Sequence, residues 1–119
     1  MRVLIVEGNP SLGSIWRRHL ERRGCIVDLS TTQNDAIELL RDKDVDVIVL
    51  DLILKNGSAF AVADFASYRR PSAKVIFVSD TSFFSDGSIF QHIPNACAMM
   101  PSQVPPEDLG AIVEHYGAF

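Results

Sequence analysis

Residues 45–57 read VDVIVLDLILKNG, and this stretch decides the fold. Its apolar run is almost unbroken and rich in β-branched residues, which predicts a central strand buried on both faces, as in parallel sheets. The strand ends in a carboxylate, Asp51, and a loop with Asn56 and Gly57 follows. Open α/β sheets carry their reactive groups at the carboxyl ends of strands. Asp51 is therefore the first candidate for a functional side chain.

The composition is that of an ordinary globular domain. A chain of 119 residues can build one hydrophobic core but not two, so we expect a single domain over residues 1–119. The net charge of -4 disfavours binding to nucleic acid or to an anionic membrane. The sequence enters a strand at once, without a signal-peptide pattern, and no apolar stretch approaches membrane length. These observations predict a cytoplasmic protein.

The cysteines and histidines do not form a recognisable reactive group. Cys25 and Cys97 have neither metal-site nor redox-pair spacing, and we expect reduced thiols buried in strands. His19 lies on the apolar side of a predicted helix and is expected to be half-buried. His92 and His115 have no partners at ligand spacing, so we expect them at the surface.

Short apolar runs alternate with helical patterns along the chain. Strands are predicted at 3–6, 25–30, 45–51, 74–79 and 96–100. Asn9 before Pro10 and Gly24 predict the two ends of the first helix, and Thr32 with Asp35 predicts a capping box at the second. The apolar side chains of the first helix repeat at helical spacing, which predicts that they face the core: Leu12, Ile15, Trp16 and Leu20. Further helices are expected over 58–70, where Phe60 is available to the core, over a short stretch after 86, and from 105 onward.

This alternation predicts an α/β fold in which a parallel sheet has helices on both faces, because strand–helix–strand units require right-handed crossovers. The carboxyl ends of the first, third, fourth and fifth strands then meet at one edge of the sheet. Four side chains are expected there: Glu7, Asp51, Ser79 and Met100.

Over its whole length the chain resembles a bacterial response-regulator receiver domain, the phosphoacceptor module of two-component signalling. The resemblance rests on VLIVEGNP at 3–10, VIVLD at 47–51, VIFVS at 75–79 and MP at 100–101. It implies a flavodoxin-like (βα)5 three-layer sandwich with strand order 2-1-3-4-5. It also implies a phosphorelay signalling module, not an enzyme, whose partner is a histidine kinase or another signalling protein.

The resemblance assigns a role to three residues. Asp51 matches the phosphoacceptor, and Ser79 matches the hydroxyl that hydrogen-bonds a phosphoryl oxygen. Glu7 matches the first of two acids that, with the acceptor, bind Mg²⁺. Glu7 and Asp51 are thus the expected metal ligands.

Four positions depart from the family pattern. Gly8 stands where the second acid is expected, and Met100 where the family has a lysine that pairs with the phosphoryl group. Cys97 matches the aromatic residue that swings inward on phosphorylation. Asp80 follows the hydroxyl where the family usually has a small residue, and joins an acidic pocket that would repel an anionic phosphodonor. These departures predict weakly bound Mg²⁺, or none, and no other cofactor.

The predicted function is therefore a phosphorylation-impaired receiver, or pseudo-receiver, that acts through protein–protein interaction, with a homodimer as a further candidate assembly. An alternative is a working single-domain phosphoacceptor, a phosphoprotein in which a histidine kinase phosphorylates Asp51. A less favoured alternative is a flavodoxin-type small-molecule binder, because Glu7 places a carboxylate where a phosphate loop needs hydrogen-bond donors.

Overall fold

The structure is a computed structural model that describes residues 1–54, 56–79 and 93–117. Strands and helices alternate, except that the predicted short helix after residue 86 lies outside the described residues. The strands are β1 (Arg2–Val6), β2 (Ile26–Ser30), β3 (Val47–Asp51), β4 (Lys74–Ser79) and β5 (Ala96–Pro101), and the helices are α1 (Pro10–Arg22), α2 (Gln33–Asp42), α3 (Ala59–Arg69) and α4 (Pro106–Gly117).

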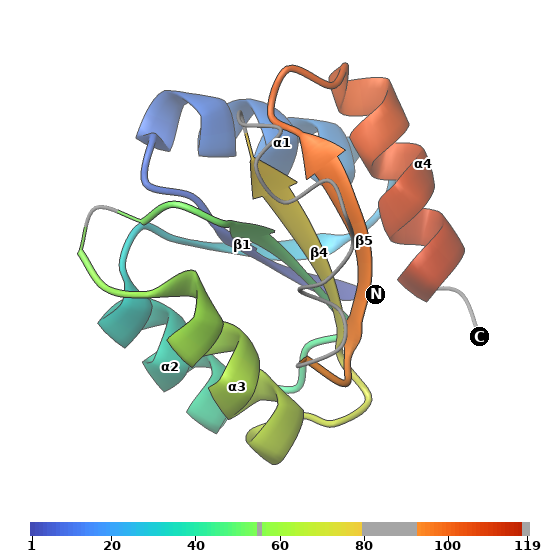
Figure 1. The fold of residues 1–119 in the computed structure, drawn as a ribbon. Helices are drawn as coiled ribbons and strands as arrows, with labels where there is room; N and C mark the ends of the chain where they lie inside the picture. The colour runs from blue at the N-terminus through green and yellow to red at the C-terminus, as the bar shows by residue number, and fades with distance from the viewer. Residues whose placement is uncertain (55, 80–92, 118–119) are drawn as a thin grey trace.

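The sheet is parallel throughout and has five strands in the order β2-β1-β3-β4-β5. Helices α1 and α4 cover one face, and α2 and α3 cover the other (Figure 1). This arrangement confirms the flavodoxin-like α/β fold and the predicted strand order. Within the described part of the chain, no helix is both long and apolar enough to cross a membrane.

Strand β3 has the buried central position that its sequence predicts. The side chains of residues 47–50 are all 0% exposed. Successive side chains of a strand point to opposite faces. Val47 and Val49 accordingly enter the core beneath α1 and α4, whereas Ile48 and Leu50 enter the core beneath α2 and α3. An unbroken apolar run is needed because the sheet is covered on both faces.

The helix ends follow from local capping. The side chain of Asn9 accepts hydrogen bonds from the backbone N–H groups of Ser11 and Leu12, at 3.0 and 3.3 Å, and so satisfies two donors at the start of α1. Gly24, with a φ of +93°, lets the chain turn away after α1. The Oγ1 of Thr32 accepts from the N–H of Asp35 at the start of α2.

Three predictions about individual side chains were inaccurate. Ile15 is 44% exposed. Helix α1 contacts the core through Trp16 and Leu20, and adjacent positions on a helix are rotated by about 100°, so Ile15 lies outside the buried face. Phe60 is 43% exposed rather than in the core. Cys25 is buried but lies just before β2, not within it.

The histidines agree with their predicted environments where the structure describes them. His19 is half-buried, and its Nε2 accepts a hydrogen bond from the Nε of Arg23 at 3.1 Å. His115 is exposed. His92 lies outside the described residues.

Candidate functional site

The carboxyl ends of four strands meet at one edge of the sheet, as predicted. The register pairs Val6 with Leu50, so the next residues, Glu7 and Asp51, are neighbours across β1 and β3. Asp51 in turn pairs with Val78, and Val78 pairs with Met100. Directly paired residues of a sheet point to the same face, and neighbouring strands are about 4.8 Å apart. Met100 therefore lies on the same face as Asp51, two strands away.

Glu7 is buried, and its carboxylate is directed at the start of α1. Only 4% of its surface is exposed. Its Oε1 accepts a hydrogen bond from the N–H of Asn9 at 3.1 Å, and its own N–H donates to the carbonyl of Ser30 at 3.0 Å. The amino end of a helix favours negative charge, so this environment suits a carboxylate at this position.

Asp51 is half-buried, and hydrogen bonds hold the two residues that follow it. Its Oδ1 accepts from the N–H of Ile53 at 3.1 Å, and the N–H of Leu52 donates to the carbonyl of Val78 at 2.8 Å. Among the residues that the structure describes, Oδ2 has no hydrogen-bond partner. In the described part of the chain, one oxygen of Asp51 is therefore used in a local hydrogen bond and the other is not.

Ser79 ends β4 and is 3% exposed. Its carbonyl accepts a hydrogen bond from the N–H of Ser102 at 3.0 Å, which joins the ends of β4 and β5. Asp80, the third member of the predicted acidic pocket, lies outside the described residues. The structure therefore brings together Glu7 and Asp51 on adjacent strands, with Ser79 one strand further.

Gly8 and Met100 provide neither a metal ligand nor a cation at this edge. A Cβ added to Gly8 would meet no atom of the described residues within 4 Å, apart from its two chain neighbours, and Gly8 is not among the glycines with positive φ. The backbone therefore does not require glycine here. Met100 is half-buried and packs against the core beneath α1 and α4.

The donor set for a divalent ion is incomplete in the described part of the chain. No group of three or more His, Cys, Asp or Glu side chains that could hold a metal is found among those residues. Glu7 and Asp51 supply two carboxylates from neighbouring strands, and hard cations such as Mg²⁺ prefer such oxygen ligands. The described residues therefore fit only part of the site that the resemblance implies.

Cys97 lies on β5 and is half-buried. Its Sγ donates a hydrogen bond to the carbonyl of Val75 at 3.4 Å, and burial raises the pKa of the thiol to about 11. The side chain is thus attached to β4 and is much smaller than the aromatic residue that the family has at this position. Cys97 and Cys25 are both free thiols, as predicted, but Cys97 is half-buried rather than buried.

The environment of Cys97 predicts slow thiol chemistry. With Cys25 replaced by Ala, we expect Cys97 at pH 8 to react with a disulfide reagent about a hundredfold more slowly than an ordinary thiol, because its reactive thiolate is that much rarer. The absorbance of the thiolate that the reagent releases measures the rate. The same variant unfolded in urea is the control and should react at the ordinary rate; equal rates in both states would contradict the prediction.

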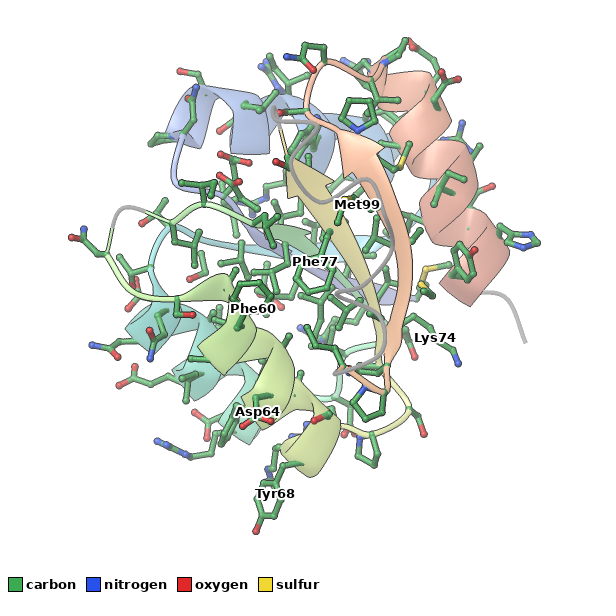
Figure 2. The ribbon with its side chains drawn as sticks, in the orientation of Figure 1. Phe60, Asp64, Tyr68, Lys74, Phe77 and Met99 are labelled. Carbon is green, nitrogen blue, oxygen red and sulfur yellow. The ribbon has the colours of Figure 1, made fainter. Side chains whose placement is uncertain are left out.

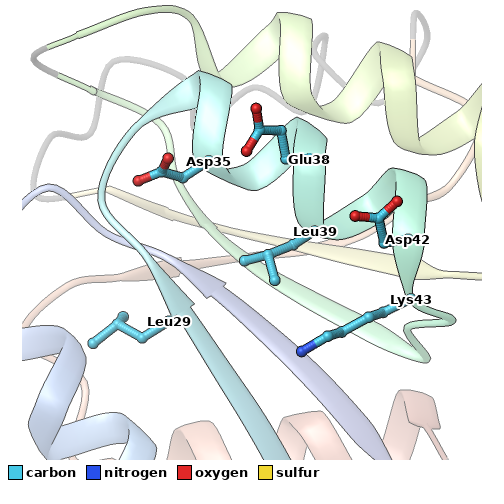
Figure 3. Close-up of a pocket in the computed structure, with 6 residues that line it drawn as sticks. All are labelled: Leu29, Asp35, Glu38, Leu39, Asp42 and Lys43. Carbon is cyan, nitrogen blue, oxygen red and sulfur yellow. The ribbon is translucent and has the colours of Figure 1, made fainter.

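A groove of about 300 Å³ lies elsewhere, between the outer edge of β2 and α2 (Figure 3). Leu29 and Leu39 contribute its apolar atoms, and the carboxylates of Asp35, Glu38 and Asp42 lie along α2. Its one lysine, Lys43, forms an ion pair with Asp28 at 3.2 Å. None of the predicted site residues lines this groove.

One feature of the site region was missed by the sequence analysis. The loop after Asp51 contacts the first residue of α2, Gln33, whose Oε1 accepts a hydrogen bond from the N–H of Ser58 at 2.8 Å. No local signal marks Gln33, because its partner is 25 residues away in sequence. The one local indication of a constrained backbone was Gly57, which the sequence places in the loop after Asp51.

The fold and the carboxylates at its edge define a class of protein, the flavodoxin-like α/β domain with acidic groups at the carboxyl ends of its strands. The family model for the response regulator receiver domain matches residues 3–88, which is more than half of the chain. This chain therefore belongs to the response regulator receiver family, the signalling modules of two-component systems. The matched range ends before β5, where Cys97 and Met100 lie.

Solved structures with the same fold include three receiver domains of low sequence identity. A CheY-like receiver protein from Methanospirillum hungatei has a TM-score of 0.89 at 20% identity, covering 98% of this chain and 92% of that one. The non-phosphorylated HemR receiver domain from Leptospira biflexa has a TM-score of 0.87 at 22% identity, covering 99% and 94%. The receiver domain of a sensor histidine kinase from Pseudomonas aeruginosa, with a magnesium ion coordinated in its active-site cleft, has a TM-score of 0.84 at 15% identity, covering 99% and 98%. No curated protein matches this chain.

Proposed function

We propose that residues 1–119 are one receiver domain that is impaired in phosphorylation, a pseudo-receiver, and that it acts in a two-component phosphorelay by binding a histidine kinase or another signalling protein. The observation that carries this proposal is the pair of departures at Gly8 and Met100. Both lie at the edge of the sheet that holds Asp51, and neither has a charged side chain.

The expected loss of reactivity follows from electrostatics. Phosphoryl transfer to a carboxylate depends on cations that neutralise the developing charge, and the family supplies them through a metal site and a lysine. One unit charge about 4 Å from the reacting group is worth roughly 4 kcal/mol at an effective dielectric of about 20. That energy corresponds to a rate factor of about a thousand. Losing a metal ligand and the lysine therefore slows transfer strongly.

We infer that Mg²⁺ binds this site weakly or not at all. If an ion binds, Glu7 and Asp51 are the residues that hold it, and it supplies positive charge next to an incoming phosphoryl group. Glu7 and Asp51 alone carry the same formal charge as a complete site of three carboxylates and one lysine. The attraction for a cation is therefore retained, whereas one direct ligand is missing.

Treatment of the native chain with a small phosphodonor tests the proposal directly. We expect less than stoichiometric modification of Asp51 after incubation with Mg²⁺ and acetyl phosphate, and little change in Trp16 fluorescence with beryllofluoride. Intact-protein mass spectrometry measures the modification, and an Asp51→Asn variant sets the background. Stoichiometric modification with a large spectral change would refute the impaired receiver.

A working phosphoacceptor is the second candidate, because Asp51 and Ser79 occupy the ends of β3 and β4 as a functional site requires. In this case a histidine kinase phosphorylates Asp51, and phosphoryl transfer is slow but still produces a signal. Mass spectrometry for an aspartyl phosphate after incubation with histidine kinases separates the two candidates. A second copy of this chain is an alternative protein partner, which sedimentation of the purified protein tests.

A further inference from the structure

The loop that follows Asp51 is held at its beginning by hydrogen bonds to β4 and to Asp51 itself. The N–H of Leu52 donates to the carbonyl of Val78, and the N–H of Ile53 donates to Oδ1 of Asp51. Ile53 is 59% exposed, whereas Leu52 and Leu54 on either side of it are buried in the core beneath α2 and α3. The Ile53 amide therefore reports directly on the Asp51 carboxylate.

The far end of the same loop is held by Gln33, the first residue of α2. Its side-chain Oε1 accepts from the N–H of Ser58 at 2.8 Å, and its backbone N–H donates to the carbonyl of Asn56 at 3.3 Å. Ser58 is also the N-cap of α3, where its hydroxyl accepts from the N–H of Ala61 at 3.4 Å. Gln33 thus joins the start of α2 to both the loop and the start of α3.

Gly57 lies directly against the Gln33 side chain. A Cβ at Gly57 would clash with the Cβ of Gln33, and the φ of Gly57 is +116°, which residues with side chains rarely adopt. The close approach allows the two hydrogen bonds on either side of Gly57 to form together. The loop residues 56–58 are therefore fixed to α2 by two hydrogen bonds and one tight contact.

We propose that Gln33 is a positioning residue for Asp51. By fixing residues 56–58 to α2, it determines where the loop that starts at Asp51 can lie, and so the orientation of the Asp51 carboxylate. This inference rests on the proposed function in taking Asp51 as the group to which a ligand or phosphoryl group is added. The coupling is reciprocal, so a protein bound at the first turn of α2 changes the Asp51 site, and a group bound to Asp51 changes the start of α2.

The test uses NMR of the native chain and three variants at neighbouring positions. Gln33→Met keeps the side-chain length but removes the acceptor oxygen, Gln33→Glu keeps an acceptor oxygen, and Asn34→Met is the matched control at an exposed site. In Gln33→Met we expect hydrogen exchange of the Ser58 amide to accelerate about tenfold, which is the effect of one lost hydrogen bond of typical strength. We also expect the Ile53 amide signal to shift, whereas both signals stay close to native in the other two variants.

The Ile53 signal separates a positioning role from a merely structural one. Faster exchange at Ser58 with an unchanged Ile53 signal in Gln33→Met would overturn the proposal, as would an equal Ile53 shift in Asn34→Met. If Gln33→Met does not fold, Gln33→Ala takes its place with the same expected signals. In the reverse direction, Asp51→Asn must shift the side-chain amide signal of Gln33, and an unchanged signal also overturns the proposal.

A second readout uses a variant in which the site is completed by Gly8→Asp and Met100→Lys. In that background we expect Gln33→Met to weaken beryllofluoride binding about tenfold, and Gln33→Glu to retain it. Equal binding by both would contradict the positioning role. If the completed variant itself binds no beryllofluoride, the explanation given for impaired phosphorylation fails, while the Ile53 shift in the native chain still decides the role of Gln33.

Discussion

The double variant Gly8→Asp, Met100→Lys is expected to accept phosphoryl groups from acetyl phosphate at least about a thousandfold faster than the native chain, and only with Mg²⁺ present. The two substitutions restore one acid beside Glu7 and one ammonium group on the face of the sheet to which Asp51 points. Neither position is filled by a side chain that the fold requires. Apart from its two chain neighbours, no described residue has an atom within 4 Å of a Cβ added at Gly8, and the side chain of Met100 is about as long as that of a lysine.

Rates of aspartyl-phosphate formation, followed by mass spectrometry, measure the gain. Asp51→Asn in the double variant is the control and must abolish it, whereas each single substitution should give only part of the effect because the acid and the ammonium act on the same phosphoryl group. A folded double variant that stays inert would show that Gly8 and Met100 are not the decisive losses. Asp80 and Cys97 would then be the next positions to change.

Replacing Phe77 by Ala is expected to lower the free energy of unfolding by about 3–5 kcal/mol, a large part of the stability of a small domain. Phe77 is 0% exposed in the middle of β4, and its ring lies 6.3 Å from that of Phe60 on α3 (Figure 2). Truncation leaves a cavity between the sheet and α3 that surrounding side chains cannot fill. Urea titration measures the change, with the single tryptophan, Trp16, as the fluorescent probe.

Tyr68 provides the matched aromatic control for this measurement. It is on α3, is 83% exposed and points away from the sheet (Figure 2). Its replacement by Ala should change the free energy of unfolding by no more than about 0.5 kcal/mol, as for most surface positions. A comparable loss in both variants would mean that burial against the sheet is not the source of the stability attributed to Phe77.

Much of the architecture could be predicted because it depends on local patterns. The apolar run that ends at Asp51 can only be stable where both faces of a strand are covered, and this places β3 at the centre of a parallel sheet. Asn9, Gly24 and Thr32 satisfy or end helix backbones within a few residues of themselves, so their roles are visible in the local sequence. Once the strand order is known, the meeting of Glu7 and Asp51 follows from topology alone.

Other features depend on contacts between distant segments. The exposure of Ile15 and Phe60 depends on how far each helix is rotated against the sheet, which helical spacing does not specify. That Gly8 has room for a side chain is a property of the space around it, not of its neighbours in sequence. The contact between Gln33 and the loop at Gly57 depends on α2 and α3 lying side by side on one face of the sheet (Figure 1).

The strands, the helices and the residues at the sheet edge thus followed from local patterns of hydrophobicity and capping, whereas the strand order followed from the resemblance to the receiver family. The tertiary structure alone decided which carboxylate oxygens are already used, which side chains stay exposed, and how the loop after Asp51 is held. The physical reason is the range of the interactions. Hydrophobic periodicity and caps act over three or four residues, whereas the hydrogen bond from Ser58 to Gln33 joins positions that only folding brings together.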